Sequence, residues 1–590
     1  MSWPFLTRFS LIPHRCRRWN RHQSLLVRSQ PDLEESQQSH PCQMDLNHAH
    51  AVLIAYINKN YWFFLDEWMF LTDRAFFPKG TDLGILDGHN GHLSVLPVIT
   101  YRIIFKLFGV RTYVPYLAVL IAFHVALCHA LWRLIRKVGV RPWTATAAIG
   151  IFAVLGAGVE NLSWAFQWSF FGPLLFGTCA LLVIKESGKV EKKEWLASAL
   201  LVLGIITSGT GIAIVFIVTL TLLLRNRKSA IPVIVAPAAA VYLTWYVLVS
   251  VATPVTDNLS VTQPWSIAIR VMPEFVWNGL TGAASASIGL SAIGPLVIGG
   301  LFVFALRFGR PKIEPWPLVL PMAAGAILFL ALVAITRSGL GVTYGASSRY
   351  VYVVVALLLP LATLCFDYLA NGKPLRPLFL ALITGVLILS SVTPLWRIRT
   401  GESSRIASKK AFVAVAHLSR DGEKFLVPDV INFAGLKILT IKELEILLRN
   451  GDLPKNIDLS PADILNARIS YQSAVGPKSL VEGAPPELIP QKGMLVEPDG
   501  LGCFRVTSKT SNLEMSFRFS EPGSLRFYTD LGENITLTAY QKNAKATKEI
   551  GVANKTWQFL SIAWPANKVK ISFPNQSATT LCEISVMREK

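Results

Sequence analysis

Long apolar runs separated by short polar segments dominate the chain from residue 49 to residue 398. Many of them approach the roughly 20 apolar residues that a helix needs to cross the hydrocarbon layer of a membrane. Including a weak first run, hydropathy predicts about eleven crossings. The expected fold is therefore a polytopic α-helical membrane protein over residues 49–398.

The first run, residues 49–64, is interrupted by Asn58, Lys59 and Asn60. Its helix would reach only about 24 Å, short of the roughly 30 Å that a span requires. After a polar loop over residues 65–92, Leu93–Phe108 has apolar residues at helical spacing but also Pro97, Arg102 and Lys106. That pattern predicts an amphipathic helix in the membrane interface.

The pattern changes after residue 398. Residues 399–490 are soluble in composition, and helices are expected over Ser404–Leu418 and Ile441–Asn450. Residues 491–590 alternate apolar and polar positions in short runs separated by Gly and Asn turns, which predicts a small antiparallel β-sandwich. Such a domain could bind sugar or act as a passive lid.

The distribution of charge orients the predicted helices. The 590-residue chain has a formal net charge of +20 but only 16% charged residues, and its mean hydropathy is +0.44. Lys and Arg gather in every second connection between apolar runs, which is the positive-inside pattern and not a nucleic-acid-binding face. We therefore expect a multi-pass protein of the bacterial inner membrane, surrounded by membrane lipids, with an extracytoplasmic C-terminal domain and no nucleic-acid partner.

Residues 1–48 are basic and have no apolar core, so they do not form a secretory signal. They are predicted to be a disordered tail, with Met44 as an alternative start and a transit peptide as the less favoured alternative. The cysteines have no zinc-site spacing. Cys503 and Cys582 share the C-terminal domain and would pair in an oxidising compartment.

Candidate chemistry begins in the loop over residues 65–92. Asp66 and Glu67 follow the first run directly and so lie at the expected outer membrane boundary, in a loop that also contains Asp73 and Asp82. Carboxylates at that boundary are candidates for function because charge is costly inside the membrane. The alternative is a solvated helix end with Trp68 as an interface anchor.

The same loop ends in Asp87-Gly-His89-Asn-Gly-His92. Two histidines three residues apart, with Asp87 nearby, could hold a divalent cation or a phosphate, or form only a polar turn. The spacing matches no strong zinc motif, so no metal ligands are assigned, and a divalent cation is kept as an alternative to a phosphate.

Two further outer segments carry polar residues. Glu160 and Gln167 lie among tryptophans, a combination that suits sugar binding and equally suits an aromatic interface belt. Arg337 and Arg349 lie in a glycine-rich outer loop, against the charge bias. Guanidinium groups grip phosphate in a planar fork, although they also anchor lipid headgroups.

This layout resembles the C-type superfamily of membrane glycosyltransferases, over roughly residues 50–400. The superfamily uses polyprenyl-phosphate-linked sugars and includes the protein mannosyltransferases and the aminoarabinose transferases. The resemblance rests on the acidic pair Asp66-Glu67 after a first span, the turn Gly91-His92-Leu93 where relatives often show His-Pro-Pro, an interfacial helix ending in Leu107-Phe108-Gly109, and a span ending in Arg133 and Arg136.

The resemblance implies inverting sugar transfer from a polyprenyl-phosphate donor to a glycan, lipid or protein acceptor. Asp66 by analogy, or Glu67, would be the general base, and Arg337 or Arg349 would stabilise the departing phosphate. Three alternatives remain: a transporter or flippase of lipid-linked glycans, a polymerase of such glycans, and a non-enzymatic membrane protein that binds glycan through its β domain.

Overall fold

The computed structural model describes most of the chain. The described residues are 49–64, 66–71, 84–89, 91–250, 264–371, 376–400, 402–427, 429–431, 437–500, 502–529 and 534–586. The expected basic tail over residues 1–48, and Asp73 and Asp82 of the acidic loop, lie outside them.

The chain divides into two compact units. The bundle unit comprises Met1–Lys59, Asp82–Thr100 and Tyr116–Thr400, and the sandwich unit comprises Asn60–Thr81, Tyr101–Pro115 and Gly401–Lys590. The acidic loop is divided between them: Asp66 and Glu67 belong to the sandwich unit, whereas Asp87, His89 and His92 belong to the bundle unit.

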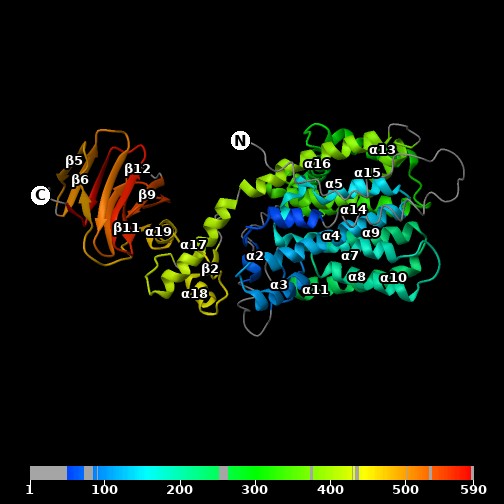
Figure 1. The fold of residues 1–590 in the computed structure, drawn as a ribbon, viewed down its shortest axis with the longest axis horizontal. Coiled ribbons are helices and arrows are strands. Elements are labelled where there is room, and N and C mark those ends of the chain that lie inside the picture. Colours follow the sequence, from blue (N-terminus) through cyan, green and yellow to red (C-terminus); the bar gives the residue numbers. More distant parts are fainter. Residues whose placement is uncertain are drawn as a thin grey trace. The chain divides into compact units, whose positions relative to one another are not determined.

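The bundle unit is built mainly of helices (Figure 1). A helix over residues 49–57 precedes the labelled ones. The helices of ten or more residues are α3 (Val95–Phe108, which ends in the sandwich unit), α4 (Val114–Lys137), α5 (Pro142–Ala153), α7 (Trp168–Val183), α8 (Trp195–Ile205), α9 (Thr210–Leu224), α11 (Ala236–Trp245), α12 (Trp265–Ile288), α13 (Gly294–Phe308), α14 (Trp316–Arg337), α15 (Ser348–Leu369) and α16 (Arg376–Thr400).

Short helical turns connect these helices and form much of the candidate site described below. They are η3 (Gly156–Gly158), α6 (Val159–Ser163), η4 (Ala165–Gln167), η5 (Lys192–Glu194), η6 (Lys228–Ala230), α10 (Ile231–Ile234), the π-helical turn η7 (Tyr246–Ser250), η8 (Ser338–Leu340) and η9 (Val342–Ala346).

Six helical segments in the described part of the chain are long and apolar enough to cross a membrane, and a bent pair over Lys228–Ile234 and Ala236–Ser250 raises the number to seven. The six are Val114–Lys137, Pro142–Ser163, Ala165–Val183, Trp316–Leu340, Ser348–Leu369 and Leu380–Ile398. The multi-span prediction therefore holds, but the expected eleven crossings are not confirmed.

The difference has a physical origin in helix length. The α8 helix has 11 residues and α9 has 15, so at 1.5 Å per residue they reach only about 16 and 22 Å. The α13 helix is likewise 15 residues long. In each case hydropathy correctly predicted an apolar helix, but polar turns end the helix before it can cross the hydrocarbon layer alone.

Basic residues cluster at one end of the bundle. The Arg141 Nε–Asp367 Oδ1 pair is 3.0 Å long and joins the start of α5 to the end of α15. At the same end Lys137 donates to carbonyls at the end of α7, and Arg225 pairs with Glu314 at 2.6 Å between α9 and α14. Among the described residues, the predicted outer loops between α5 and α7, between α8 and α9, and between α14 and α15 lie at the opposite ends of these helices.

The sandwich unit begins with the short helix α2 (Asp66–Met69). The expected helices after residue 399 are present as α17 (Glu402–Arg420) and α18 (Ile441–Arg449), together with a hairpin of β1 (Asp429–Ile431) and β2 (Lys437–Thr440). A further helix, α19 (Pro461–Tyr471), was not predicted, although the sequence Ser460-Pro-Ala-Asp463 forms its capping box.

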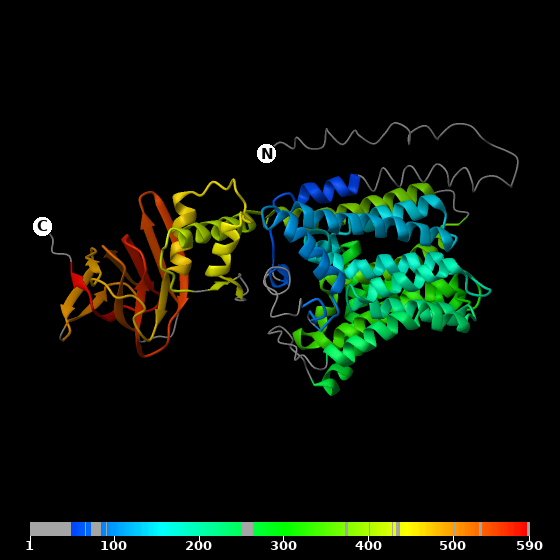
Figure 2. The ribbon, with the colours of Figure 1, turned by 90° about the horizontal axis from the view of Figure 1, so that it is seen from below.

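Two six-stranded sheets complete the unit, in the orders β10-β9-β12-β7-β4-β14 and β3-β11-β8-β13-β6-β5 (Figure 2). Their strands are β3 (Ser473–Gly476), β4 (Glu487–Ile489), β5 (Met494–Pro498), β6 (Cys503–Ser508), β7 (Leu513–Phe519), β8 (Gly523–Thr529), β9 (Asn534–Gln541), β10 (Ala544–Gly551), β11 (Thr556–Ile562), β12 (Ala566–Phe573), β13 (Ala578–Cys582) and β14 (Ser585–Val586).

Both sheets contribute to one apolar core, which includes Met515 and Phe517 from the first sheet and Phe527 and Leu560 from the second. The predicted β domain is therefore present, with its first strands earlier in the chain than expected. Cys503 and Cys582 form a disulfide, as expected for an oxidising compartment.

Candidate functional site

The turn that carries His89 and His92 is closed by two reciprocal backbone hydrogen bonds. His89 N–H donates to the His92 carbonyl, and His92 N–H donates to the His89 carbonyl, both at 2.9 Å. Gly91 lies within this turn at φ +75°, a conformation that favours glycine. The His89 ring is buried and packs edge-on against Phe166 of η4, with a centroid separation of 5.4 Å.

The imidazole of His92 is seated against the α8–α9 turn. A Cβ on Gly209 would lie 2.8 Å from Cε1 of His92, so only glycine leaves room for the ring there. Burial, with smaller contributions from the charges of Arg337 and His89, lowers the pKa of His92 to about 4. His92 is therefore neutral at pH 7 and acts there as a hydrogen-bonding group rather than as a cation.

Arg349 and Glu160 join two loops that are distant in sequence. The Arg349 Nε and a Glu160 carboxylate oxygen are 3.1 Å apart, and both side chains are partly exposed. The backbone N–H of Glu160 donates to the Ser348 hydroxyl at 3.2 Å, next to Arg349 at the start of α15. The Arg349 guanidinium also lies 6.0 Å from the centre of the Trp164 ring.

Tyr350 connects these charged groups. Its hydroxyl lies within electrostatic range of the side chains of Arg349, Tyr344, Arg337 and Glu160. Because α14 ends at Arg337, α15 begins at Ser348 and His92 lies against the α8–α9 turn, the structure places His92, Arg337, Arg349 and Glu160 at one end of the bundle. We refer to these four residues as the charged cluster.

Two carboxamides are buried beside the charged cluster. Asn161 and Gln167 have no solvent exposure, and among the described residues neither side-chain amide has a hydrogen-bond partner. They flank Trp164, which packs 5.3 Å from Phe166. Buried amides without partners are costly, so groups of this kind are candidates for ligand contacts.

Glu67 lies in the sandwich unit and is completely buried. Its Oε1 accepts hydrogen bonds from the hydroxyls of Tyr101 and Tyr113, both at 2.8 Å. Its Oε2 accepts from the Phe64 N–H at 2.9 Å. Three donors therefore hold this carboxylate in place at the centre of an aromatic cluster.

Asp66, the first residue of α2, is partly exposed, unlike its neighbour. The helix is held in place by Trp68, whose ring stacks on Phe412 of α17 at 4.7 Å and whose Nε1 donates to the Phe63 carbonyl. Nearby, Gly109 at φ +57° approaches Asp452 so closely that a Cβ would lie 2.7 Å from its Oδ1. These contacts make the acidic pair part of the same compact unit as the C-terminal region.

The remaining predicted site residue, Asp87, is partly exposed in the segment before His89. The Trp245 indole anchors that segment by donating to the Leu86 carbonyl at 2.7 Å. Across the described residues, no group of three or more His, Cys, Asp or Glu side chains has the arrangement of a metal site. The structure therefore identifies no ligand set for the divalent cation considered from the sequence.

Several residues with contacts in or beside the candidate site were not singled out from the sequence. Tyr350 and Ser348 flank Arg349 directly, and that adjacency was the available signal. Gly209 and the two tyrosines that hold Glu67 gave none, because their contacts join segments far apart in the chain. Tyr113, for example, is 46 residues from Glu67.

An apolar pocket of about 250 Å³ lies within the bundle unit. Helices α5, α12, α13, α15 and α16 line it, with residues such as Phe152, Ile298 and Leu359. The α15 helix carries Arg349 in its first turn and lines the pocket from Val355 to Phe366. One helix thus connects the charged cluster with an apolar cavity.

No family model matches the chain, and no curated protein matches it by sequence. Among solved structures, the chain is similar to the crystal structure of ArnT from Cupriavidus metallidurans bound to undecaprenyl phosphate, at 14% sequence identity and a TM-score of 0.41. The match covers 68% of this chain and 84% of that chain.

Proposed function

We propose that this chain is an integral membrane glycosyltransferase that moves a sugar from a polyprenyl-phosphate donor to an acceptor hydroxyl. The observation that carries the proposal is the charged cluster, which gathers Arg337 and Arg349 at one end of the bundle. Outer loops rarely contain arginine. Two guanidinium groups at the same end of the bundle suit an anionic headgroup such as a phosphate.

The apolar pocket supports a lipid-linked phosphate over a free one. Its lining is almost entirely aliphatic and aromatic, and it begins within two turns of Arg349 along α15. An isoprenoid chain needs such a lining for the part nearest the phosphate, while the rest lies among membrane lipids. The pocket would hold only part of a long chain at its volume of about 250 Å³.

Within the acidic pair, the hydrogen bonds favour Asp66 over Glu67 as the general base. Glu67 is fully buried and accepts hydrogen bonds from three groups, so it has no access to an acceptor hydroxyl, whereas Asp66 is partly exposed. We assign Glu67 a positioning role, fixing α2, and Asp66 the proton-accepting role.

The proposed step is a single inverting displacement. The acceptor hydroxyl attacks the anomeric carbon of the donor, its proton passes to Asp66, and the bond between the anomeric carbon and the phosphate oxygen breaks. The electron pair of that bond leaves with the polyprenyl phosphate, whose added negative charge Arg337 and Arg349 stabilise. The buried amides of Asn161 and Gln167 offer both donors and acceptors to sugar hydroxyls.

The test is transfer by full-length protein in nanodiscs, supplied with a panel of polyprenyl-phosphate-linked sugars and candidate acceptors. The substitution Asp66→Asn is expected to lower the rate about 10²- to 10⁴-fold, the usual contribution of a general base. The control, Arg310→Ala, changes an exposed residue at the basic end and should leave the rate unchanged.

Full activity in Asp66→Asn would contradict the base assignment. If the wild-type protein moves labelled lipid-linked glycan between leaflets and transfers no sugar, the protein is a transporter and the enzyme proposal is wrong.

A further inference from the structure

The outer face of one sheet of the sandwich carries aromatic and polar side chains that the proposed transfer reaction does not use. In β8 and β11, Leu525, Phe527 and Leu560 point into the apolar core. Side chains alternate between the two faces of a sheet, so the intervening residues point outward. Those residues include Arg526, Tyr528, Trp557 and Phe559, all partly exposed.

Strand register aligns five outward side chains across this face. Trp557 pairs with Tyr528, Thr580 pairs with Arg505, and Arg505 pairs with Glu497. Leu581 pairs with Phe527, so the same register places Thr580 beside Tyr528. The aromatic row, Trp557-Tyr528-Thr580-Arg505-Glu497, therefore crosses five strands and is about 19 Å long at the usual strand spacing.

The aromatic end of the row is held rigidly. The Arg526 guanidinium lies 4.6 Å from the Trp557 ring centre and 5.8 Å from that of Phe559, and the Tyr528 ring meets Trp557 edge-on at 5.5 Å. The Nε of Arg526 is buried and has no hydrogen-bond partner among the described residues. The rings thus form an ordered platform with an unused donor beside it.

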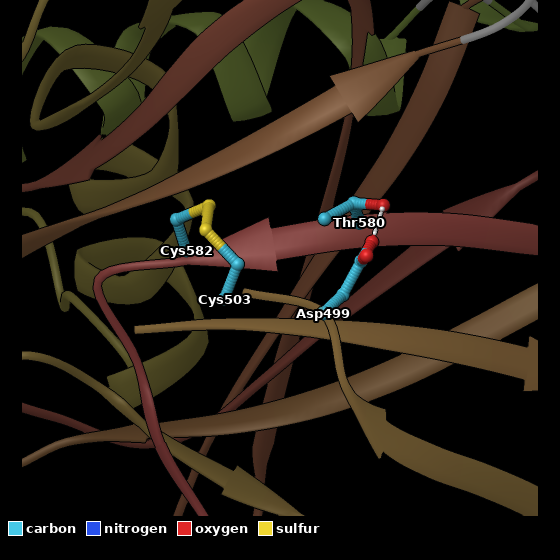
Figure 3. Close-up of a disulfide and its surroundings, with 4 residues drawn as sticks. All are labelled: Asp499, Cys503, Thr580 and Cys582. Carbon is cyan, nitrogen blue, oxygen red and sulfur yellow. Dashed lines mark hydrogen bonds between the residues drawn. A yellow bond between two sulfur atoms is a disulfide. The ribbon is translucent and has the colours of Figure 1, made fainter. Parts of the chain in front are cut away.

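The polar end of the row is fixed as well. Thr580 donates to Asp499 at 2.9 Å, and the neighbouring pair Cys503 and Cys582 is joined by the disulfide (Figure 3). On the other side of Arg526, the hydroxyls of Ser524 and Ser561 bond to the segment containing Ser479 and Leu480. The segment containing Ser479 and Leu480 therefore borders the row on the side of Ser524 and Ser561, and the contacts at both ends hold the row in place.

We propose that the aromatic row is a binding site for a neutral oligosaccharide. A sugar ring has an apolar face that packs on aromatic rings, and hydroxyls that both donate and accept hydrogen bonds. Arg505 and Arg526 are balanced by Glu497 and Asp499, so this face has no excess positive charge for a nucleic acid or an anionic membrane surface. The row belongs to the sandwich unit and the charged cluster to the bundle unit, and the proposed binding does not depend on the transfer proposal.

The test uses the full-length protein in nanodiscs and three soluble probes: hexasaccharides of glucose, of mannose and of N-acetylglucosamine. At least one of them is expected to bind by calorimetry, and Trp557→Ala should weaken it about tenfold or more, as loss of an aromatic anchor does. Trp557→Phe keeps a ring and should retain most of the affinity. Tyr528→Ala is a second variant, and unchanged melting of each protein shows that the sheet is intact.

Two control variants locate the binding. Tyr540→Ala removes a partly exposed ring on the other sheet, where Lys568 lies 5.4 Å from it in a similar cation–aromatic contact, and should have no effect. Arg349→Ala changes the charged cluster and should also have no effect. The proposal is overturned if no probe binds at millimolar concentration, if the row variants bind as wild type does, or if Arg349→Ala abolishes binding.

Discussion

A carboxylate oxygen of Glu160 lies 3.1 Å from the Nε of Arg349, and this pair connects the segment after α5 with the start of α15. Glu160 is thereby placed to orient the guanidinium that we assign to the donor phosphate. Both side chains are partly exposed, so the pair contributes more to geometry than to stability.

Glu160→Gln removes that charge while keeping the shape of the side chain. We expect the KM for the lipid-linked donor to rise about tenfold with a smaller change in kcat. The reason is that the Arg349 guanidinium is assigned to binding the donor phosphate, so its misorientation weakens donor binding more than it slows the chemical step. The control is Glu186→Gln, an exposed glutamate in the α7–α8 connection. Equal kinetics for Glu160→Gln and wild type would show that Arg349 does not depend on this pair.

Gly209→Ala tests the close contact between Gly209 and the His92 ring. The backbone of Gly209 is ordinary for alanine, at φ −57° and ψ −18°, so strain arises only from the new Cβ against the His92 ring. We expect transfer activity to fall about 10²-fold, as displacements of about 1 Å can cause, with little change in melting temperature. Gly299→Ala, where nothing lies within 4 Å of the added Cβ, should leave activity unchanged; equal rates for both variants would remove His92 from the site.

Much of the fold follows from pattern alone. Apolar runs of 19 to 25 residues predict the longer spans well, because a helix that leaves water must satisfy its own backbone hydrogen bonds. Alternation in residues such as Leu513, Met515 and Phe517 predicts buried strands for the same local reason. The predicted spans at α8, α9 and α13 are not confirmed, because these apolar helices are too short to cross the hydrocarbon layer alone.

The candidate site was only partly predictable. Arg337 and Arg349 were visible as charges against the local bias, and Glu160 as an acid among aromatics. The role of Glu67 was not visible, because its partners Tyr101 and Tyr113 reach it only through folding. A local pattern reports propensity and exposure, whereas long-range hydrogen bonds distinguish a buried carboxylate from an exposed one.

The hydrogen bonds on Glu67 predict a large loss of stability when it is removed. Glu67→Ala removes the acceptor of two hydroxyl hydrogen bonds and one N–H hydrogen bond, at about 1–3 kcal/mol for each buried group. Tyr101→Phe or Tyr113→Phe alone should cost about 1 kcal/mol. Thermal melting of the full-length protein in detergent measures these effects.

A triple variant distinguishes two effects of replacing Glu67: loss of the acceptor for the Tyr101 and Tyr113 hydroxyls, and loss of side-chain volume. Adding Tyr101→Phe and Tyr113→Phe to Glu67→Leu removes both hydroxyls together with their acceptor, so it should melt higher than Glu67→Ala. Melting of the triple variant below Glu67→Ala would show that packing, not hydrogen bonding, makes Glu67 important.

The pair of Glu194 and Arg227 predicts a specific pH dependence. Both side chains are buried and joined by two hydrogen bonds, of 2.6 and 3.0 Å. Burial alone would raise the pKa of Glu194, but the bonds from Arg227 and from the backbone N–H groups of Glu191 and Lys185 lower it to about 2. Because the folded pKa is below the ordinary 4.5, this stabilisation is present above pH 4.5 and is lost as pH falls towards 2.

Melting temperatures measured across that pH range check this prediction. Wild type should lose stability between pH 4.5 and 2 more steeply than Glu194→Gln, which itself should be about 3–5 kcal/mol less stable at pH 7 because Arg227 is left buried and unpaired. The exposed Lys193→Ala should cost under about 1 kcal/mol. Parallel pH profiles for wild type and Glu194→Gln would contradict the assigned pKa.

The central claim is that Arg337 and Arg349 hold the phosphate of a polyprenyl lipid, and affinity for polyprenyl phosphate tests it most directly. Titration of a polyprenyl monophosphate into wild-type protein in nanodiscs should give saturable binding. The same titration with Arg337→Ala or Arg349→Ala should give at least about tenfold weaker binding, since a charge-assisted hydrogen bond contributes about 1.5–3 kcal/mol. Arg310→Ala should bind as wild type does. Equal affinity of all four proteins, or saturable binding of the uncharged polyprenol at the same strength, would contradict the account.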